Sequence, residues 1–228
     1  MHFLLIFLAF FAIAEARQCY FLPPQGWEIA QLKTPSPHVK IGFIGKGSTD
    51  FRPSLNLAFE EVDVSLKDYI KAVKELQLSD PTNKWRDLGK FPTKAGIGRL
   101  TEMSNTSPWG EIKIYQAIFV EKGMAYILTA AVLKEDFPKF QAELMKAFRS
   151  LSVTDDLCSA IPDAQERGLF QSFYATLGTN EDKEEEWDKL QKQVGSLSQL
   201  GPYWQFLALQ EGRTKIYAAN TSEDSTGK

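Results

Sequence analysis

The sequence predicts an α+β protein, an α/β/α sandwich with a central antiparallel β-sheet followed by a small C-terminal helical extension. Three observations predict this fold. Alternating apolar residues mark several strands, two stretches carry apolar residues along one helical face, and the chain after residue 154 has a helical pattern. Because each amphipathic helix must cover a sheet face, the two helices together predict a sheet enclosed between them.

Composition excludes several protein classes. The 228 residues have a net charge of −3, with 43% hydrophobic and 24% charged residues, which excludes a fibrous or wholly disordered protein. The length suits one large or two small domains. Two cysteines exclude a disulfide-rich scaffold and a thiolate-based zinc or iron–sulfur centre. With only two histidines, one of them at position 2, we expect no cofactor and no enzymatic activity.

The N-terminus has the pattern of a secretory signal. Residues 3–14 are twelve apolar residues without a charge, whereas a membrane span needs roughly 20. Ala14-Glu15-Ala16 supplies the small-x-small pattern that signal peptidase cleaves. We therefore expect residues 1–16 to be a signal peptide and the mature chain to begin at Arg17, in the periplasm or secreted. An uncleaved membrane anchor is the alternative.

The two cysteines leave three alternatives open. Cys19 lies just past the cleavage site, so one alternative is a lipid anchor attached to it. A lipoprotein signal has small residues directly before the modified cysteine, whereas this chain has Arg17 and Gln18 there. A disulfide between Cys19 and Cys158 is compatible with an export compartment. Two unpaired thiols that pack as small hydrophobic side chains are the third alternative.

The first half of the sandwich is expected to contain two strands and a helix. Residues 39–43 and 55–59 alternate as half-buried strands do, with turn residues at 45–48 between them. Ser65 is a suitable helix N-cap, with Asp68 three residues later. Apolar residues then recur on one helical face up to position 76, and Pro81 marks the exit.

The second half repeats this order. Residues 97–103 form an expected strand, and residues 111–121 and 124–133 form an antiparallel hairpin joined at Lys122-Gly123. In Gly96-Ile97-Gly98 the glycines indicate a close backbone approach or a bulge. A helix over residues 136–151 carries a stripe of apolar residues that must cover a sheet: Phe137, Phe140, Leu144, Phe148 and Leu151.

After residue 154 the pattern is helical. Helices are expected over 163–177 and 181–200, with Gly201-Pro202 ending the second, and a third starts within 203–209. The acidic run 184–186 lies in a first helical turn, where the helix dipole favours it. The expected organisation is a signal peptide (1–16), a sandwich domain (17–154), a helical extension (155–221) and a disordered tail (222–228).

Charge divides at the same boundary. Residues 17–154 carry 19 Lys and Arg against 15 Asp and Glu, whereas residues 155–228 carry 7 against 13. Two solvated surfaces of opposite sign explain this, and so does a basic face that meets an anionic protein partner. The candidate partner-binding residues are Lys84, Arg86, Lys90, Lys94 and Arg99. They lack the density and the interleaved aromatic residues of a nucleic-acid surface.

Catalytic patterns are nearly absent. His38 is the only histidine after residue 16, so a hydrolase would depend on it as the base, and no triad accompanies it. Residues 45–48 lack the spacing of a phosphate-binding loop. Trp27 and Trp109 lie at turns, where they either pack in the core or outline a groove for a partner or a small apolar ligand.

The order of the motifs resembles a known superfamily. Pro24-x-Gly26-Trp27 opens the domain, Ser65-Leu66-x-x-Tyr69 begins the first helix, and Gly-x-Ala-Tyr-x-Leu-Thr at 123–129 precedes the helix that ends at Phe148-Arg149-Ser150-Leu151. Over residues of about 23–153 this resembles the PsbP-like superfamily, and best its exported bacterial branch, the DcrB-type proteins. The resemblance implies the sandwich fold and a role in binding or stabilising protein assemblies, with no common active site.

The combined prediction is an exported, non-enzymatic binding or assembly factor that acts through contacts with a protein partner. The alternatives are a carrier of a small apolar ligand in the cell envelope and a hydrolase that uses His38.

Overall fold

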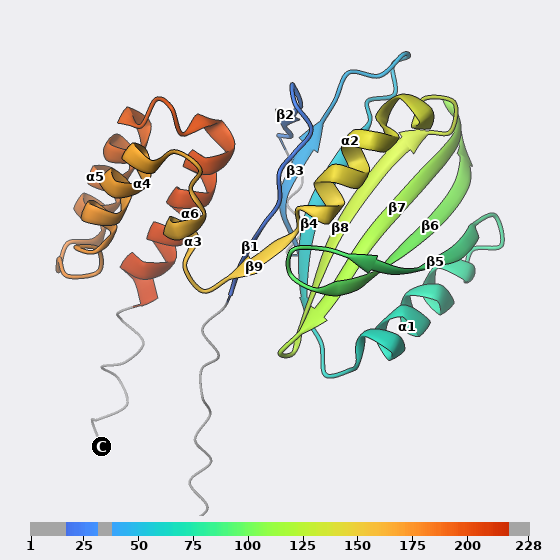
Figure 1. Cartoon of the computed structure of the whole chain (residues 1–228), viewed down its shortest axis with the longest axis horizontal. Helices are drawn as coiled ribbons and strands as arrows, with labels where there is room; N and C mark the ends of the chain where they lie inside the picture. The colour runs from blue at the N-terminus through green and yellow to red at the C-terminus, as the bar shows by residue number, and fades with distance from the viewer. Residues whose placement is uncertain (1–16, 32–37, 219–228) are drawn as a thin grey trace, which may run out of the picture.

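The computed structural model describes residues 17–31 and 38–218 and has an α+β fold (Figure 1). A seven-stranded antiparallel sheet is covered by helices, and a separate group of helices follows at the C-terminal end. The signal peptide predicted over 1–16 and the tail predicted over 222–228 lie outside the described residues.

All neighbouring strands of the main sheet are antiparallel, in the order β2-β3-β4-β8-β7-β6-β5. The strands are β2 (Glu28–Ile29), β3 (Val39–Ile44), β4 (Ser54–Glu61), β5 (Lys84–Pro92), β6 (Ile97–Ser107), β7 (Gly110–Glu121) and β8 (Met124–Leu133). The predicted strands at 39–43, 55–59 and 97–103 and the hairpin are confirmed. Lys122 and Gly123 have φ of 49° and 78°, the positive pair that a tight hairpin turn requires.

Strand β5 has no counterpart in the sequence analysis. Its pairing with β6 shifts between Asp87 and Gly89, so a bulge interrupts the alternation. Trp85 consequently packs on one face of the sheet and Phe91 in the core on the other. At the start of β6, a side chain at Gly98 would collide with the carbonyl oxygen of Ile118, which confirms the close backbone approach.

Helix α2 (Phe137–Arg149) covers one face of the sheet, as its apolar stripe predicts. The ring of Phe137 stacks on Tyr115 with centroids 4.5 Å apart, and Phe148 meets Phe91 edge-on. Leu144 and Phe148 are completely buried in this core. The main hydrophobic core therefore lies between α2 and the sheet.

Helix α1 (Leu66–Leu78) lies on the opposite face. The Ser65 hydroxyl accepts a hydrogen bond from the Asp68 amide, which confirms the predicted N-cap. Ile70 packs there against Ile118 and Ile127, whose strand neighbours point into the other core. The sheet is thus enclosed between α1 and α2, as the sequence predicts.

A short ribbon of two strands connects the sandwich to the C-terminal helices. Strand β1 (Gln18–Tyr20) pairs antiparallel with β9 (Ser152–Thr154), which directly follows α2. Three residues are too few to show a periodic pattern, and neither strand has a counterpart in the sequence analysis.

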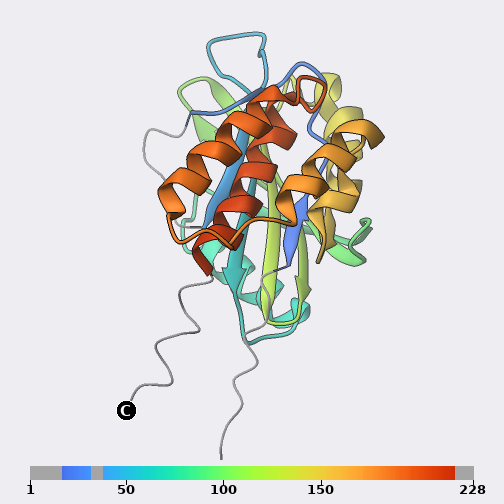
Figure 2. The same ribbon diagram turned by 90° about the vertical axis from the view of Figure 1, so that its left-hand side faces the viewer.

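Four helices follow: α3 (Leu157–Ala160), α4 (Ala164–Tyr174), α5 (Lys183–Ser196) and α6 (Gly201–Ala218). They lie in front of the sheet when viewed from their side (Figure 2). The prediction that Gly201-Pro202 ends a helix is wrong, because α5 ends at Ser196 and Gly201-Pro202 opens α6. A proline in a first helical turn lacks only an N–H that would have no partner inside the helix.

Helix α6 belongs to both hydrophobic cores. Tyr203 and Leu207 are buried in the core of the sheet, whereas Ala208 and Ile216 are buried among α3, α4 and α5. Trp204 packs against both clusters. The C-terminal helices therefore use the sandwich itself to cover their apolar surface.

Candidate functional site

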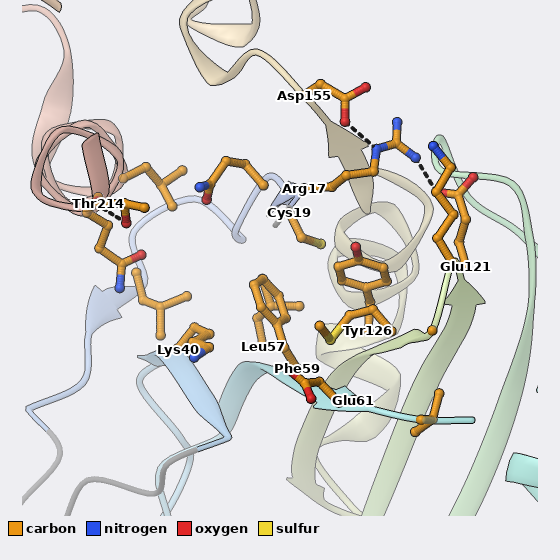
Figure 3. Close-up of a pocket in the computed structure, with 18 of the residues that line it drawn as sticks. Arg17, Cys19, Lys40, Leu57, Phe59, Glu61, Glu121, Tyr126, Asp155 and Thr214 are labelled. Atoms are coloured by element: carbon orange, nitrogen blue, oxygen red, sulfur yellow. Dashed lines mark hydrogen bonds and ion pairs between the residues drawn. The ribbon is translucent and has the colours of Figure 1, made fainter. Parts of the chain in front are cut away.

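A groove of about 1280 Å³ lies between the sheet and α6 (Figure 3). Residues of β1, β3, β4, the β7–β8 hairpin, the linker after β9 and α6 line it. Leu207 is buried where α6 meets the sheet core, while Gln210, Arg213 and Thr214 farther along α6 line the opening. The groove exists because only the first half of α6 packs on the sheet.

The sheet side of the groove is apolar. Alternation along β4 and β8 turns Leu57, Phe59, Met124 and Tyr126 to this face. Phe59 and Tyr126 are register partners, and their rings meet edge-on with centroids 5.3 Å apart. Phe59 and Met124 are half-buried, so this wall offers apolar surface to an occupant. Methionine adapts to varied shapes, because its side chain is unbranched and has three rotatable bonds.

The α6 side of the groove is polar. Gln210, Arg213, Thr214 and Tyr217 recur at helical spacing and line it. The Arg213 guanidinium lies 5.7 Å from the centroid of the Trp187 ring, and the Tyr217 hydroxyl donates a 2.8 Å hydrogen bond to a carboxylate of α5. These contacts hold the polar wall against α5.

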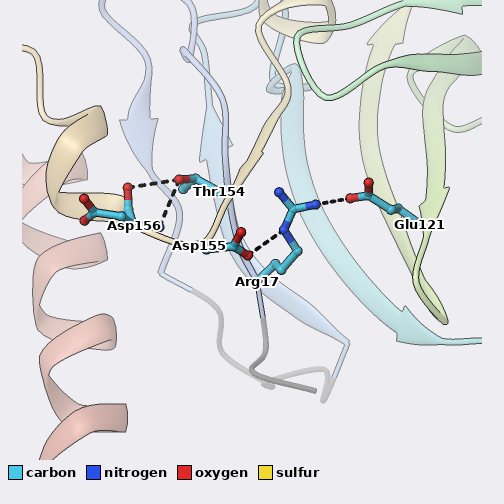
Figure 4. A network of polar contacts seen from close by, with 5 residues as sticks. All are labelled: Arg17, Glu121, Thr154, Asp155 and Asp156. Carbon is cyan, nitrogen blue, oxygen red and sulfur yellow. Dashed lines mark hydrogen bonds and ion pairs between the residues drawn. The ribbon is translucent and has the colours of Figure 1, made fainter. Parts of the chain in front are cut away.

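An ion-pair network borders the groove (Figure 4). The Arg17 guanidinium pairs with Glu121 at the end of β7, and its Nε donates a 2.7 Å hydrogen bond to Asp155. The Thr154 hydroxyl in turn exchanges 3.0 Å hydrogen bonds with the main chain of Asp156. The network ties the start of β1 and the linker after β9 to the β7–β8 hairpin.

Both cysteines are free and buried, so the structure has no disulfide between Cys19 and Cys158. They lie in different cores, Cys19 in that of the sheet and Cys158 in that of the helices. A lipid on Cys19 also conflicts with the fold, because its thiol is packed inside and the acyl chains would need that space. The alternative that fits is two unpaired thiols.

Nucleophilic chemistry in the groove is disfavoured. Burial raises the pKa of the Cys19 thiol far above neutrality. Burial also raises the pKa of Tyr126 to about 12, with a smaller contribution from Cys19. Because a thiol or phenol reacts as its anion, neither group is activated at neutral pH.

His38 is exposed just before β3. Within residues 17–31 and 38–218, no hydrogen bond joins its imidazole to a hydroxyl, thiol or carboxylate. The same part of the chain has no group of three or more histidine, cysteine or acidic residues suited to a metal ion.

The five basic residues do not form one patch. Lys84 and Arg86 lie on the face that carries α2, whereas the bulge places Lys90 and Arg99 on the face that carries α1. Lys94 lies in the turn after β5. Arg86 pairs with Glu102 at 2.7 Å, and Arg99 pairs with Asp87. Their binding to a partner stays a prediction.

The two tryptophans singled out in the sequence differ in exposure. Trp27 is half-buried and meets the Phe140 ring edge-on at 5.9 Å, so it closes one end of the main core. Trp109 is 53% exposed at the β6–β7 turn, 5.9 Å from the Phe51 ring and beside a second cavity of about 430 Å³. Neither residue lines the groove.

The groove itself was not predicted from the sequence. Its residues come from six separate segments, and each segment alone has only the pattern of a strand, a turn, a linker or a helix. The best sequence signal is α6, which keeps polar residues at helical spacing at its C-terminal end.

No helix in the described part of the chain is long and apolar enough to cross a membrane. No protein-family model and no curated protein sequence matches the chain.

Several solved structures are similar to this chain. LpqN, described as involved in cell envelope biogenesis of Mycobacterium tuberculosis, has 10% identity and a TM-score of 0.49, covering 63% of this chain and 87% of LpqN. A cyanobacterial PsbP from Synechocystis sp. PCC 6803 has 14% identity and a TM-score of 0.44, with 60% and 92% covered. The Ran-binding protein Mog1p of Saccharomyces cerevisiae has 16% identity and a TM-score of 0.41, with 61% and 96% covered.

What these structures share with this chain is the fold. The narrower likeness to the exported bacterial branch stays a prediction. Identities this low, with TM-scores below 0.5, support no inference about function, so the proposals below depend on the groove.

Proposed function

We propose that this protein is a non-enzymatic binding protein that holds a segment of a partner polypeptide in the groove between the sheet and α6. The observation that carries the proposal is the size and chemistry of the groove. Its volume of about 1280 Å³ exceeds the roughly 300–1,000 Å³ of small-molecule pockets. Its apolar wall and polar wall suit a chain that carries both kinds of side chain.

The charges around the groove support a polypeptide over a purely apolar ligand. Four cationic and four acidic residues line it: Arg17, Lys40, Lys122, Arg213, Glu61, Asp63, Glu121 and Asp155. Arg17 pairs with Glu121 and Asp155, but the other five make no ion pair within the described residues, and an apolar carrier site excludes such groups because burying charge without a partner is costly. Charges of both signs at the rim of a binding site instead fix how a protein partner is aligned and select it over other proteins.

We further propose that the chain is exported, with residues 1–16 as a signal peptide and Arg17 as the first mature residue, and that it belongs to the exported bacterial branch of the PsbP-like superfamily. Residues 17–154 would form the sandwich domain and 155–221 the helical extension. The partner-binding residues predicted from the sequence are secondary candidates, because they lie outside the groove: Lys84, Arg86, Lys90, Lys94, Arg99, Trp27 and Trp109.

A variant that fills the groove tests the proposal. Thr214 is exposed on the α6 wall, so Thr214→Trp should occupy the groove without disturbing either core. We expect the mature chain, used as bait in an envelope extract from its own source, to lose its captured polypeptide in this variant. Gln165→Trp on the exposed surface of α4 is the matched control and should keep it.

Equal capture by Thr214→Trp and by the unaltered chain would contradict the proposed function. Native mass spectrometry of protein purified from its source tests the alternative of a small-ligand carrier. A bound small molecule that Thr214→Trp displaces would favour the carrier over the polypeptide-binding function.

A further inference from the structure

The groove continues a sheet face that already binds helices. On this face, α2 docks through Phe137, Phe140 and Phe148, and the first half of α6 docks through Tyr203 and Leu207. Both helices bind this face through apolar and aromatic side chains that pack against those of the strands. The part of this face inside the groove has the same aromatic and aliphatic composition.

The main chain of the apolar wall is already paired. Strand β4 lies between β3 and β8, and β8 lies between β4 and β7. The pairing of β4 with β8 includes Phe59 and Tyr126 and continues to Glu61, the last residue of β4. The pairing of β8 with β7 likewise continues to Glu121, the last residue of β7. Within the described residues, Leu57 and Tyr126 each have a register partner on both sides, so an added strand would find no free hydrogen-bonding edge there and an occupant must bind this part of the wall through side chains.

The opposite wall requires a polar surface on the same occupant. Gln210, Arg213 and Thr214 line the groove from α6. Figure 3 shows Thr214 on the side of the groove opposite Phe59 and Tyr126. A segment with one apolar and one polar side satisfies both walls at once. In a helix that division repeats every three to four residues.

We infer that the groove accepts an amphipathic α-helix of a partner protein, with its apolar side on β4 and β8 and its polar side toward α6. This inference rests on the proposed function and specifies the form of its ligand. A helix about 10–12 Å across, rising about 1.5 Å per residue, occupies roughly 120–170 Å³ per residue. The groove of about 1280 Å³ therefore matches about eight to ten residues, or more than two turns.

Photo-crosslinking from each wall tests the inference. p-Benzoylphenylalanine in place of Phe59 reports the apolar wall, and in place of Gln210 it reports the polar wall. Placed at Gln165, it reports non-specific contact. Should the Phe59 position fail to fold, Met124 on the same wall replaces it. Adducts are formed in cells of the source and mapped by peptide mass spectrometry.

We expect adducts from the apolar wall on partner residues spaced three, four and seven apart. Adducts from Gln210 should fall on the same segment, on the opposite side of that helix. Spacing of two residues, or adducts scattered without a period, would overturn the helix while leaving a polypeptide ligand in place. Absence of adducts from both walls, or adducts on a small molecule alone, would overturn the proposed function itself.

Discussion

Glu102 is a charged side chain held inside the sheet by three partners. Its carboxylate accepts a 2.6 Å hydrogen bond from the Tyr115 hydroxyl and pairs with Arg86 at 2.7 Å and Lys113 at 3.2 Å. Burial acts to raise the pKa of Glu102, but the bonds from Tyr115, Arg86 and Lys113 outweigh burial, and the pKa is lowered. The folded protein therefore favours the charged form.

A lowered pKa fixes the sign of the pH dependence. The stability that Glu102 contributes is present above the ordinary glutamate pKa and is lost as pH falls through the lower folded value. We expect Glu102→Gln to reduce the free energy of unfolding at pH 7 by about 1–3 kcal/mol. It should also weaken the loss of stability in acid, measured by urea denaturation across pH. An unchanged acid profile would show that the carboxylate is not held this way.

At the level of elements, α4 and α5 each cap the loop that follows the other. The Glu166 carboxylate on α4 accepts a 2.9 Å hydrogen bond from the Gln199 amide, just after α5. The Glu186 carboxylate on α5 accepts a 2.8 Å hydrogen bond from the Gly178 amide, just after α4. Both glutamates are buried, so the two helices are joined at both ends.

This reciprocal arrangement predicts unequal effects within one acidic run. Glu186→Ala removes a buried acceptor and leaves the Gly178 amide without it, so we expect a loss of about 1–3 kcal/mol in the free energy of unfolding. Glu185→Ala, an exposed neighbour in the same turn, should change it by no more than about 0.5 kcal/mol. Chemical denaturation compares them, and equal effects would show that the run acts through the helix dipole alone.

Sequence pattern predicted the elements whose apolar residues face one core. The α2 stripe, the Ser65 cap and the Lys122-Gly123 hairpin are such cases, because local chemistry and tertiary contact agree. Strand β5 escaped prediction because its bulge moves Phe91 to the other face from Trp85. The sequence pattern placed the start of this helix within 203–209, whereas α6 begins at Gly201, because a helix that is buried on two sides lacks a single apolar stripe.

At the level of the whole molecule, α6 both joins the two cores and creates the groove. Its first half is shared by the sheet and the helices, and its second half leaves the sheet while staying packed on α5. No sequence pattern within one segment shows that the second half of α6 leaves the sheet, so the groove could not be predicted from the sequence. Deleting residues 155–221 would also remove Tyr203 and Leu207, whose side chains are part of the sheet core, and would expose the rest of that core. Point variants are therefore the better test of the helical extension.

The shared helix predicts how the two cores depend on one another. Leu207 is buried in the sheet core and Leu190 in the helical core, so each change to alanine removes the same side chain from a different place. Each should reduce the free energy of unfolding by about 2–5 kcal/mol.

Hydrogen exchange of the backbone amides separates the two effects: Leu190→Ala should lower protection in α4 and α5 and spare β4 and β8. Leu207→Ala should lower protection in β4, β8 and α6 together, because α6 can no longer hold the sheet face that it covers. Full protection of β4 and β8 in Leu207→Ala would mean that the sandwich does not need α6, and that the groove is only a gap between two independent units.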